Sequence, residues 1–175
     1  MQCPALKQRD TNMILLLLLF GLALGAENPS DEHEVKLQQG NCTMSWFSFN
    51  GRCYKYMATQ MTWADAELHC VSEDANLVSI HSLDEDNFVK AVIKNFRPTR
   101  EDSWIGLSDT HKEGGWMWSD GSAVNFLLWA PRQPDNKNGN ENCVHNNFME
   151  DLKWNDRRCS IFSSFVCASL FIVSK

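Results

Sequence analysis

The sequence predicts an α+β domain, and three observations lead to this fold class. Two segments with helix-capping signals lie in the first part of the chain, from residue 62 and from residue 82. Short apolar segments typical of strands follow them, around a long polar loop. Six cysteines span the same region, which is typical of a disulfide-bonded domain. Helices that precede a run of strands are typical of α+β folds.

Composition limits the function classes. A chain of 175 residues predicts one domain with a substantial core. Hydrophobic residues make up 43% and charged residues 22%, which is typical of a globular protein. The formal net charge of −6, without a run of Lys or Arg, argues against nucleic acid as a partner.

The N-terminus has the pattern of a targeting segment. Lys7 and Arg9 precede an apolar run over residues 14–24, and small residues follow at Gly25 and Ala26. The run is too short for a bilayer span of about 20 residues. We therefore predict a signal peptide over residues 1–26, a secreted extracellular protein and no stable membrane anchor. The alternative is an uncleaved signal anchor.

Signal cleavage leaves an even number of cysteines. Cys3 is removed, and six remain: Cys42, Cys53, Cys70, Cys143, Cys159 and Cys167. Six cysteines allow 15 pairings, and their spacing alone does not choose among them. No pair has CxxC spacing, so a redox motif or a zinc ribbon is not indicated. Residues 27–40 are predicted to form an acidic leader, and residues 41–175 the domain.

The first half of the domain has clear local signals. Asn50-Gly51 lies between aromatic residues and predicts a β-hairpin. Thr62 can cap a helix that buries Trp63, Ala66 and Cys70. A second helix is predicted to begin at Ser82, with Glu85 completing a capping box, and to end before Pro98. Its predicted buried residues are Phe88, Ala91 and Val92.

The second half is predicted to contain short strands and a long loop. Ser119-Asp120-Gly121 predicts a turn and residues 125–140 a loop, which in a compact domain is usually functional. Trp104, Trp116 and Trp118 are assigned to the core. The predicted strand segments are residues 104–107, 116–118, 143–147 and 162–173.

Five oxygen-bearing side chains in three short segments are the candidate metal ligands. They are Gln133, Asp135, Glu141, Asn155 and Asp156. Calcium takes six to eight oxygen ligands, and carboxylates with amide carbonyls meet that demand, whereas zinc prefers His and Cys. A single residue of this kind most often only caps a turn. The prediction therefore requires that the five side chains lie close together in the folded protein. The histidines show no metal spacing and are predicted to be scattered surface or partly buried groups: His33, His69, His81, His111 and His145.

Residues 42–168 resemble a long-form C-type lectin-like domain. Besides the six cysteines, five motifs occur in the family's order: Trp104-Ile105-Gly106-Leu107, Trp116-x-Trp118-Ser119-Asp120-Gly121, Gln133-Pro134-Asp135, Glu141-Asn142-Cys143 and Trp154-Asn155-Asp156. Small secreted fish lectins of galactose type and type II antifreeze proteins are the similar branches. The resemblance implies two helices with short antiparallel sheets, and the pairs Cys42–Cys53, Cys70–Cys167 and Cys143–Cys159. It also implies a cis peptide before Pro134.

The resemblance further implies a function. In such lectins the five candidate ligands hold Ca²⁺ and bind vicinal sugar hydroxyls. The order amide then carboxylate, Gln133 before Asp135, favours galactosides over mannosides. Galactose-type members often carry a stacking Trp after the triplet, and Lys137 lies in that stretch here, between two asparagines. Asn136 and Asn142 stand where some relatives have carboxylates of a second calcium site, which argues against that site here.

The predicted function is thus a calcium-dependent lectin that recognises galactose-type glycans on microbial or host surfaces in innate defence. One alternative is a calcium-dependent ice-binding protein of the type II antifreeze class. Another is a protein-binding domain in which the metal is only structural. No enzyme is indicated, since the G-x-S-x-G frame is absent around Ser119. No cysteine remains to join subunits covalently, so a homo-oligomer would have to be non-covalent.

Overall fold

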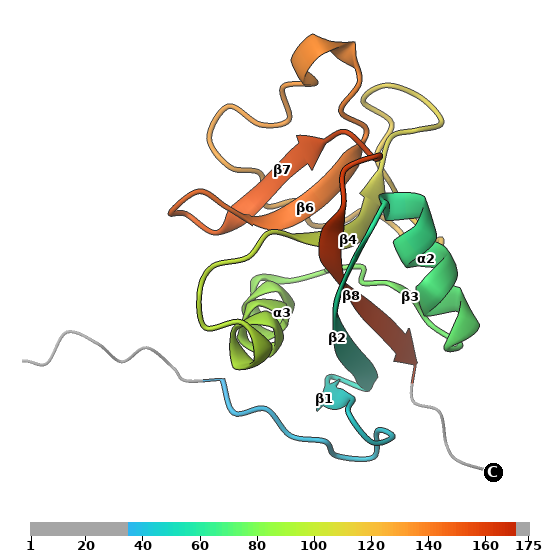
Figure 1. The fold of residues 1–175 in the computed structure, drawn as a ribbon, viewed down its shortest axis with the longest axis vertical. Coiled ribbons are helices and arrows are strands. Elements are labelled where there is room, and N and C mark those ends of the chain that lie inside the picture. The colour runs from blue at the N-terminus through green and yellow to red at the C-terminus, as the bar shows by residue number, and fades with distance from the viewer. Residues whose placement is uncertain (1–34, 171–175) are drawn as a thin grey trace, which may run out of the picture. The chain divides into compact units, whose positions relative to one another are not determined.

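A computed structural model describes residues 35–170 of the protein (Figure 1). The predicted signal peptide and the first part of the acidic leader lie outside the described residues. The elements in chain order are β1 (Phe47–Phe49), β2 (Arg52–Met61), α2 (Trp63–Ser72), β3 (Asn76–Leu77), α3 (Leu83–Phe96), β4 (Ser103–Ser108), β5 (Met117–Trp118), the 3-10 helix η1 (Lys137–Gly139), β6 (Cys143–Phe148), β7 (Lys153–Arg157) and β8 (Ser163–Leu170).

The predicted hairpin is formed by β1 and β2, which pair antiparallel. Asn50 and Gly51 connect them with φ values of 43° and 77°. Positive φ at both central positions matches the right-handed twist of the strands, and Asn-Gly adopts it at little cost. The edge of β1 is covered, because the Ser48 amide donates to the Gln38 carbonyl of the leader at 2.7 Å.

Both helices begin at the predicted caps. The Thr62 side chain accepts from the Asp65 amide at the start of α2, and Ser82 accepts from the Glu85 amide at the start of α3. Each cap satisfies a backbone donor that the first helical turn leaves unpaired. The Glu85 carboxylate does not complete the predicted capping box. It turns inward instead, as described below.

The strands form one mixed sheet in the order β1-β2-β8-β4-β6-β7, with β3 and β5 paired to β8 and β4. Neighbouring strands are antiparallel except for β4 and β8, which are parallel. The α+β fold class is confirmed. The parallel pair departs from the antiparallel sheets expected from the resemblance. No hairpin turn joins β4 to β8, so nothing in their connection requires them to run antiparallel.

Alternating residues of β2 and β8 divide the core into two parts. Tyr54 and Val166 belong to the cluster that packs on α3, whereas Cys53 and Phe165 belong to the cluster that packs on α2. Successive side chains of a strand point to opposite faces. The two helices accordingly lie on opposite sides of these strands in Figure 1.

The buried face of α3 differs in part from the prediction. Phe88 and Val92 are buried as expected. Val89 and Ile93 are also buried, although they were not assigned to the core from the sequence, while the predicted Ala91 is only half-buried. The apolar stripe of α3 is therefore wider and slightly rotated relative to the predicted one.

The three disulfides have the expected pairing: Cys42–Cys53, Cys70–Cys167 and Cys143–Cys159. Cys70 lies on α2 and Cys167 on β8, at a sequence separation of 97. Closing a loop of that length restricts the unfolded chain by on the order of 4–5 kcal/mol in the chain-entropy model. This bond therefore ties α2 to the sheet, and the Cys143–Cys159 bond joins the segments on either side of the β6–β7 hairpin.

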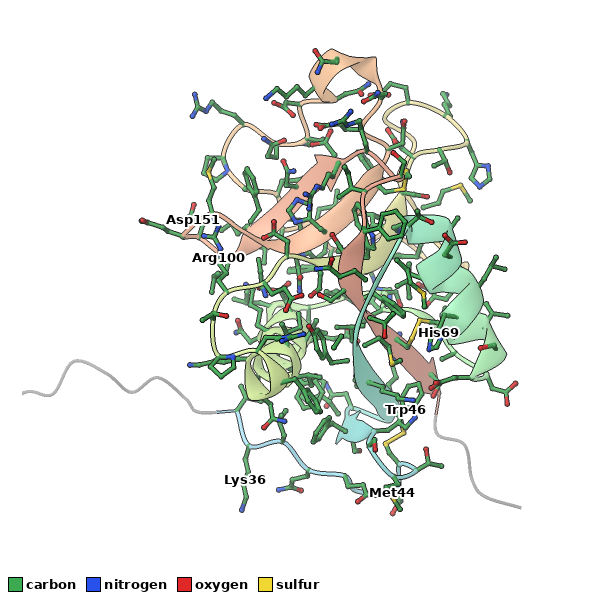
Figure 2. All side chains as sticks on the ribbon, viewed as in Figure 1. Lys36, Met44, Trp46, His69, Arg100 and Asp151 are labelled. Atoms are coloured by element: carbon green, nitrogen blue, oxygen red, sulfur yellow. A yellow bond between two sulfur atoms is a disulfide. The ribbon has the colours of Figure 1, made fainter. Side chains whose placement is uncertain are left out.

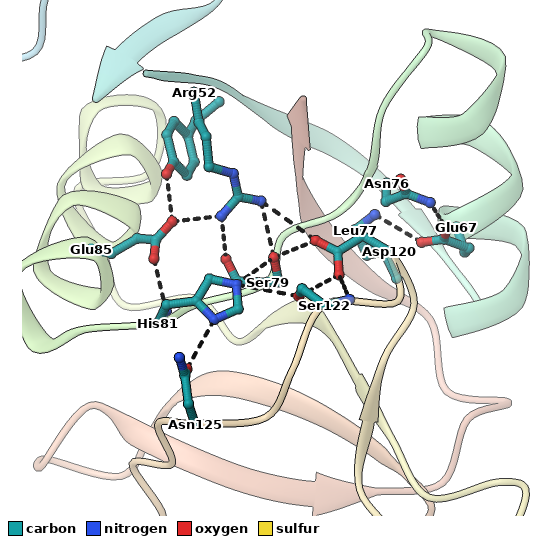
Figure 3. A network of polar contacts seen from close by, with 11 residues as sticks. Arg52, Glu67, Asn76, Leu77, Ser79, His81, Glu85, Asp120, Ser122 and Asn125 are labelled. Carbon is teal, nitrogen blue, oxygen red and sulfur yellow. Dashed lines mark hydrogen bonds and ion pairs between the residues drawn. The ribbon is translucent and has the colours of Figure 1, made fainter. Parts of the chain in front are cut away.

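A polar network crosses the α3 side of the fold (Figure 3). The Glu85 carboxylate accepts from the Arg52 guanidinium at 2.6 Å, the Tyr54 hydroxyl at 2.5 Å and the His81 amide at 2.7 Å. Arg52 also donates to Ser79. Burial raises the pKa of Tyr54, against the charge of Arg52 and together with the hydrogen bond to Glu85, so this phenol stays protonated. The network thus joins the hairpin to the start of α3.

Replacing Glu85 is expected to destabilise the protein strongly. Glu85→Ala leaves Arg52 and Tyr54 without their buried acceptor, and breaking such a pair costs about 3 kcal/mol or more. The side-chain exposures of Arg52 and Glu85 are 17% and 8%. Asp84→Ala is the matched control, because Asp84 is exposed in the same helical turn and contributes less than about 1 kcal/mol through the helix dipole. Urea unfolding with the disulfides intact measures both. Equal losses would contradict the assignment.

Candidate metal centre

Strand β7 places two of the five candidate ligands. Trp154 is fully buried, and Asn155 and Asp156 follow it directly. The Trp154 indole N–H donates to the Asp86 carboxylate of α3 at 2.8 Å. β7 pairs with β6 in a register that sets His145 opposite Asn155. The positions of Asn155 and Asp156 are therefore fixed by core packing before them and by strand pairing beside them.

The long loop is attached to the same strand. The Trp154 amide donates to the Leu128 carbonyl at 2.9 Å, and the Ala130 amide donates to the Trp154 carbonyl at 2.8 Å. Trp129 packs against Trp154 with ring centroids 6.3 Å apart. Gln133 follows, and its backbone N–H donates to the Ala130 carbonyl at 3.0 Å. Trp154 thus holds the start of the long loop in place, although this loop has little regular structure of its own.

The loop then bends back through residues that tolerate a left-handed backbone. Asn136, Asn138 and Gly139 have φ values of 40°, 60° and 69°. Asn and Gly are the residue types that adopt this region most readily. The Gln133–Pro134 peptide is cis, as the resemblance implied. The bend brings Glu141 back toward the start of the loop.

Three carboxylates meet at this point. Asp135, Glu141 and Asp156 each offer an oxygen, and these oxygens lie within 4.8 Å of one another. Asp135 is exposed, Glu141 half-buried and Asp156 fully buried. It is the one group of at least three His, Cys, Asp or Glu at metal-binding distances within residues 35–170. Like charges this close repel one another, and a cation between them would relieve that repulsion.

The Asp156 carboxylate also holds the loop. It accepts from the backbone N–H of Asp135 at 3.1 Å and from the backbone N–H of Asn136 at 2.7 Å. Hydrogen bonds to an ionised acceptor are the strong class. Removing the Asp156 carboxylate would therefore disturb the loop as well as the cluster. Asp135 is the cleaner position for a test, because its side chain makes no hydrogen bond to another described residue.

The two amide ligands fit the same interpretation. The Gln133 Oε1 is buried and accepts no hydrogen bond from another described residue. A buried carbonyl without a partner requires an explanation, and a bound ion is a common one. Both hydrogen bonds of the Asn155 amide use its nitrogen, which leaves its oxygen available. Three carboxylates and two amide oxygens form the donor set that suits Ca²⁺.

Asn136 and Asn142 link the loop to a neighbouring turn. Asn136 Nδ2 donates to Glu113 Oε2 at 2.6 Å, and Asn142 Nδ2 donates to Asp109 Oδ1 at 2.9 Å. The second carboxylate oxygen of Asp109 accepts from the Gly114 amide at 2.7 Å. At the positions that the resemblance associates with a second metal, amide–carboxylate hydrogen bonds connect the two segments directly.

The environment of Glu141 disfavours its charged form. Burial raises the pKa of Glu141, and the charges of Asp156 and Asp135 raise it further, against a hydrogen bond from the Lys137 amide that lowers it. The Lys137 amide lies 3.2 Å from Glu141 Oε2. Without a bound cation, ionised Glu141 therefore destabilises the folded state.

Sequence reasoning missed His145. It was grouped with scattered histidines, but it is 1% exposed and its Nε2 lies 3.0 Å from the Asn155 amide nitrogen. Burial lowers the pKa of His145, against the opposing charge of Asp102. The signal that could have revealed it is its place in the predicted strand at residues 143–147, beside a second strand carrying Asn155. Sequence alone does not give that register.

The chain is similar to known proteins in sequence and in fold. The family profile described as Lectin C-type domain matches residues 59–169. Ladderlectin of Oncorhynchus mykiss is 37% identical over 160 residues, covering 90% of this chain and 84% of its own. The galactose-specific lectin nattectin of Thalassophryne nattereri is 34% identical over 155 residues, covering 89% and 93%. The structure of herring type II antifreeze protein superposes with a TM-score of 0.68 and 37% identity, covering 74% of this chain and 98% of its own.

A mixed sheet with two helices and three disulfides carries the long loop and its acidic cluster. The chain belongs to the C-type lectin domain family. The two curated relatives are named as lectins, that is, carbohydrate-binding proteins, which is consistent with the expectation that this chain is not an enzyme. Within residues 35–170, no helix has the length and apolar character needed to cross a membrane.

The raised pKa of Glu141 predicts a specific pH dependence. In chelator, the folded state keeps its proton to higher pH than the unfolded state, so this group makes stability fall as pH rises from the ordinary value of 4.5 through the raised one. Glu141→Gln should therefore be more stable than wild type at pH 7 and equal to it at about pH 3. Urea unfolding across this range measures the difference. A variant less stable at pH 7 in chelator would contradict the interpretation.

Proposed function

We propose that this protein is a secreted, calcium-dependent lectin that binds galactose-type glycans. Gln133, Asp135, Glu141, Asn155 and Asp156 are the proposed ligands for Ca²⁺ and, through it, for sugar. When bound, the ion supplies coordination positions for two vicinal sugar hydroxyls. The side chains that hold it would also hydrogen-bond those hydroxyls, and such charge-assisted bonds are the strong class.

The observation that carries the proposal is the carboxylate cluster. Asp135, Glu141 and Asp156 lie within 4.8 Å of one another on the long loop and on β7. The buried Gln133 Oε1, two residues before Asp135, adds a carbonyl without a partner among the described residues. Without a cation, the repulsion between the three carboxylates and the unpaired buried carbonyl both cost stability. A bound hard cation removes both costs.

Two features support galactose as the sugar. Gln133 precedes Asp135, the order of amide and carboxylate that is typical of galactose-type members of the family. Nattectin, a relative covering 89% of this chain, is named galactose-specific. Lys137, flanked by Asn136 and Asn138, occupies the stretch where such members often have a stacking Trp, so recognition here would depend on the hydroxyls more than on the sugar face.

The biological setting we propose is innate defence against microbes, or contact with host glycans, outside the cell. Asp135 is exposed, and one sugar on such a shallow loop binds weakly; a millimolar Kd corresponds to about −4 kcal/mol. Useful binding needs several sites on one particle. With all six cysteines of the domain in internal disulfides, any assembly of subunits would be non-covalent.

Ice binding is the second candidate function. The superposition on herring type II antifreeze protein, at 37% identity, favours it. In that case calcium would order the loop of residues 133–142 into a surface that binds ice rather than sugar. Thermal hysteresis of the purified protein, with and without calcium, distinguishes the two. Hysteresis together with no retention on any sugar column would replace the lectin proposal by this one.

The lectin proposal predicts retention on immobilised lactose. The protein should bind in the presence of calcium and be released by chelator or by free galactose, because both remove a required partner of the site. Elution profiles measured by absorbance test this. Release by mannose but not by galactose would contradict the sugar assignment, and no retention on lactose or mannose would contradict lectin function altogether.

Asp135→Asn is predicted to lower calcium affinity by more than about tenfold, since loss of even an outer partner of a metal ligand usually costs about 10–100-fold. Calorimetric titration with calcium measures the change. Asp151→Asn is the matched control: it removes the same charge at the turn between β6 and β7, away from the loop (Figure 2). The proposal is contradicted if both variants bind calcium like wild type.

A further inference from the structure

His145 lies directly behind one of the proposed ligands. It stands on β6 in register with Asn155 on β7. The imidazole is 1% exposed and is held by edge-on contacts to Trp104 and Phe148, at centroid distances of 6.2 Å and 5.7 Å. The hydrogen-bond partners around this packed ring give each of its two nitrogens its own neighbours.

The neighbours of Nδ1 are oxygen atoms. The Asn146 carbonyl lies 3.1 Å from it and the nearest Asp102 carboxylate oxygen 3.9 Å. A carbonyl oxygen only accepts hydrogen bonds, so Nδ1 must carry the proton. In the neutral ring the other nitrogen, Nε2, then has a lone pair and can only accept.

The neighbour of Nε2 is the amide nitrogen of Asn155, at 3.0 Å. That nitrogen also donates to the Asp156 carbonyl. With two acceptors on one side, the NH₂ group of Asn155 is directed toward His145 and its oxygen toward the opposite edge of the amide. Asn and Gln amides otherwise reverse easily, because their two ends have nearly the same shape.

We propose that His145 is a positioning residue that fixes the amide of Asn155, so that its oxygen and not its nitrogen is presented to the metal. This inference rests on the proposed calcium function and extends it. An NH₂ group turned toward the ion would remove a ligand and add a repulsive dipole. Partners that orient a ligand are part of a metal site, and their loss usually lowers metal affinity by about 10–100-fold.

The orientation can be measured without calcium. Two-bond ¹H–¹⁵N correlation spectra of the uniformly labelled, disulfide-intact protein in chelator report which ring nitrogen carries the proton. We expect the Nδ1–H tautomer for His145 at neutral pH. The Nε2–H tautomer would place the Asn155 oxygen against the ring and overturn the proposal. This measurement stands even if the protein binds no calcium, in which case the proposed function fails separately.

Calcium titration of four proteins tests the consequence: wild type, His145→Leu, Asn155→Ala and the double variant. With Asn155 intact, His145→Leu should lower calcium affinity about tenfold. In the background of Asn155→Ala, used in place of Asn155→Asp because a carboxylate would face the two acceptors His145 Nε2 and the Asp156 carbonyl, the further loss should be less than about twofold, since no amide is left to orient. Thermal melting in chelator shows whether each variant folds. Equal losses in both backgrounds would mean that His145 acts only through packing and would overturn the proposal.

Discussion

The burial of Trp154 is the interaction on which the rest of the structure depends. Its ring lies edge-on to Trp118 and to Phe126, and its indole N–H reaches Asp86 on α3. Its amide and carbonyl bond the long loop on both sides of Trp129. One residue thus joins β5, α3, the loop and β7. Since the ligand-bearing part of β7 follows it directly, the packing that stabilises the core also places the proposed ligands.

The candidate metal site is built from a regular strand, β7, and an irregular loop. Asn155 and Asp156 lie on a strand whose pairing with β6 is flanked by the Cys143–Cys159 disulfide. The other three proposed ligands lie on a loop whose backbone turns through left-handed residues. The side chains of one strand cannot surround an ion. Carboxylates from the loop are therefore needed beside those of the strand. The Asp156 carboxylate then couples the two parts by accepting amides from the loop.

Membership in the C-type lectin domain family does not by itself decide the ligand. The same fold is shared with lectins and with an antifreeze protein, and function depends on the site rather than on the fold. Here the distinguishing features are local. Asn136 and Asn142 bond Glu113 and Asp109 directly, so the loop is braced by hydrogen bonds where a second ion would otherwise be needed. Within residues 35–170, Asp135, Glu141 and Asp156 are then the one cluster of at least three His, Cys, Asp or Glu side chains at metal-binding distances.

Much of the fold could be predicted from the sequence because its signals are short-range. Asn50-Gly51 determines the hairpin, and Thr62 and Ser82 determine where the helices begin. The resemblance supplied the cysteine pairing and the predicted roles of the five candidate ligands, and the structure brings the three carboxylates among them together. The end of the acidic leader could not be assigned in the same way from the sequence. Its described part begins at Val35, which is half-buried against the core. The boundary between the leader and the domain stays a prediction.

The sequence by itself determined the fold class and the helix starts, and it predicted the candidate oxygen ligands, since each depends on residues close in the chain or on motif order. Only the tertiary structure decided which partners the polar side chains have. Glu85 leaves its expected cap for Arg52 and Tyr54, because a largely buried arginine 33 residues away is the stronger partner. His145 becomes a neighbour of Asn155 only through the register of β6 and β7. Partners of this kind depend on contacts that no local pattern encodes.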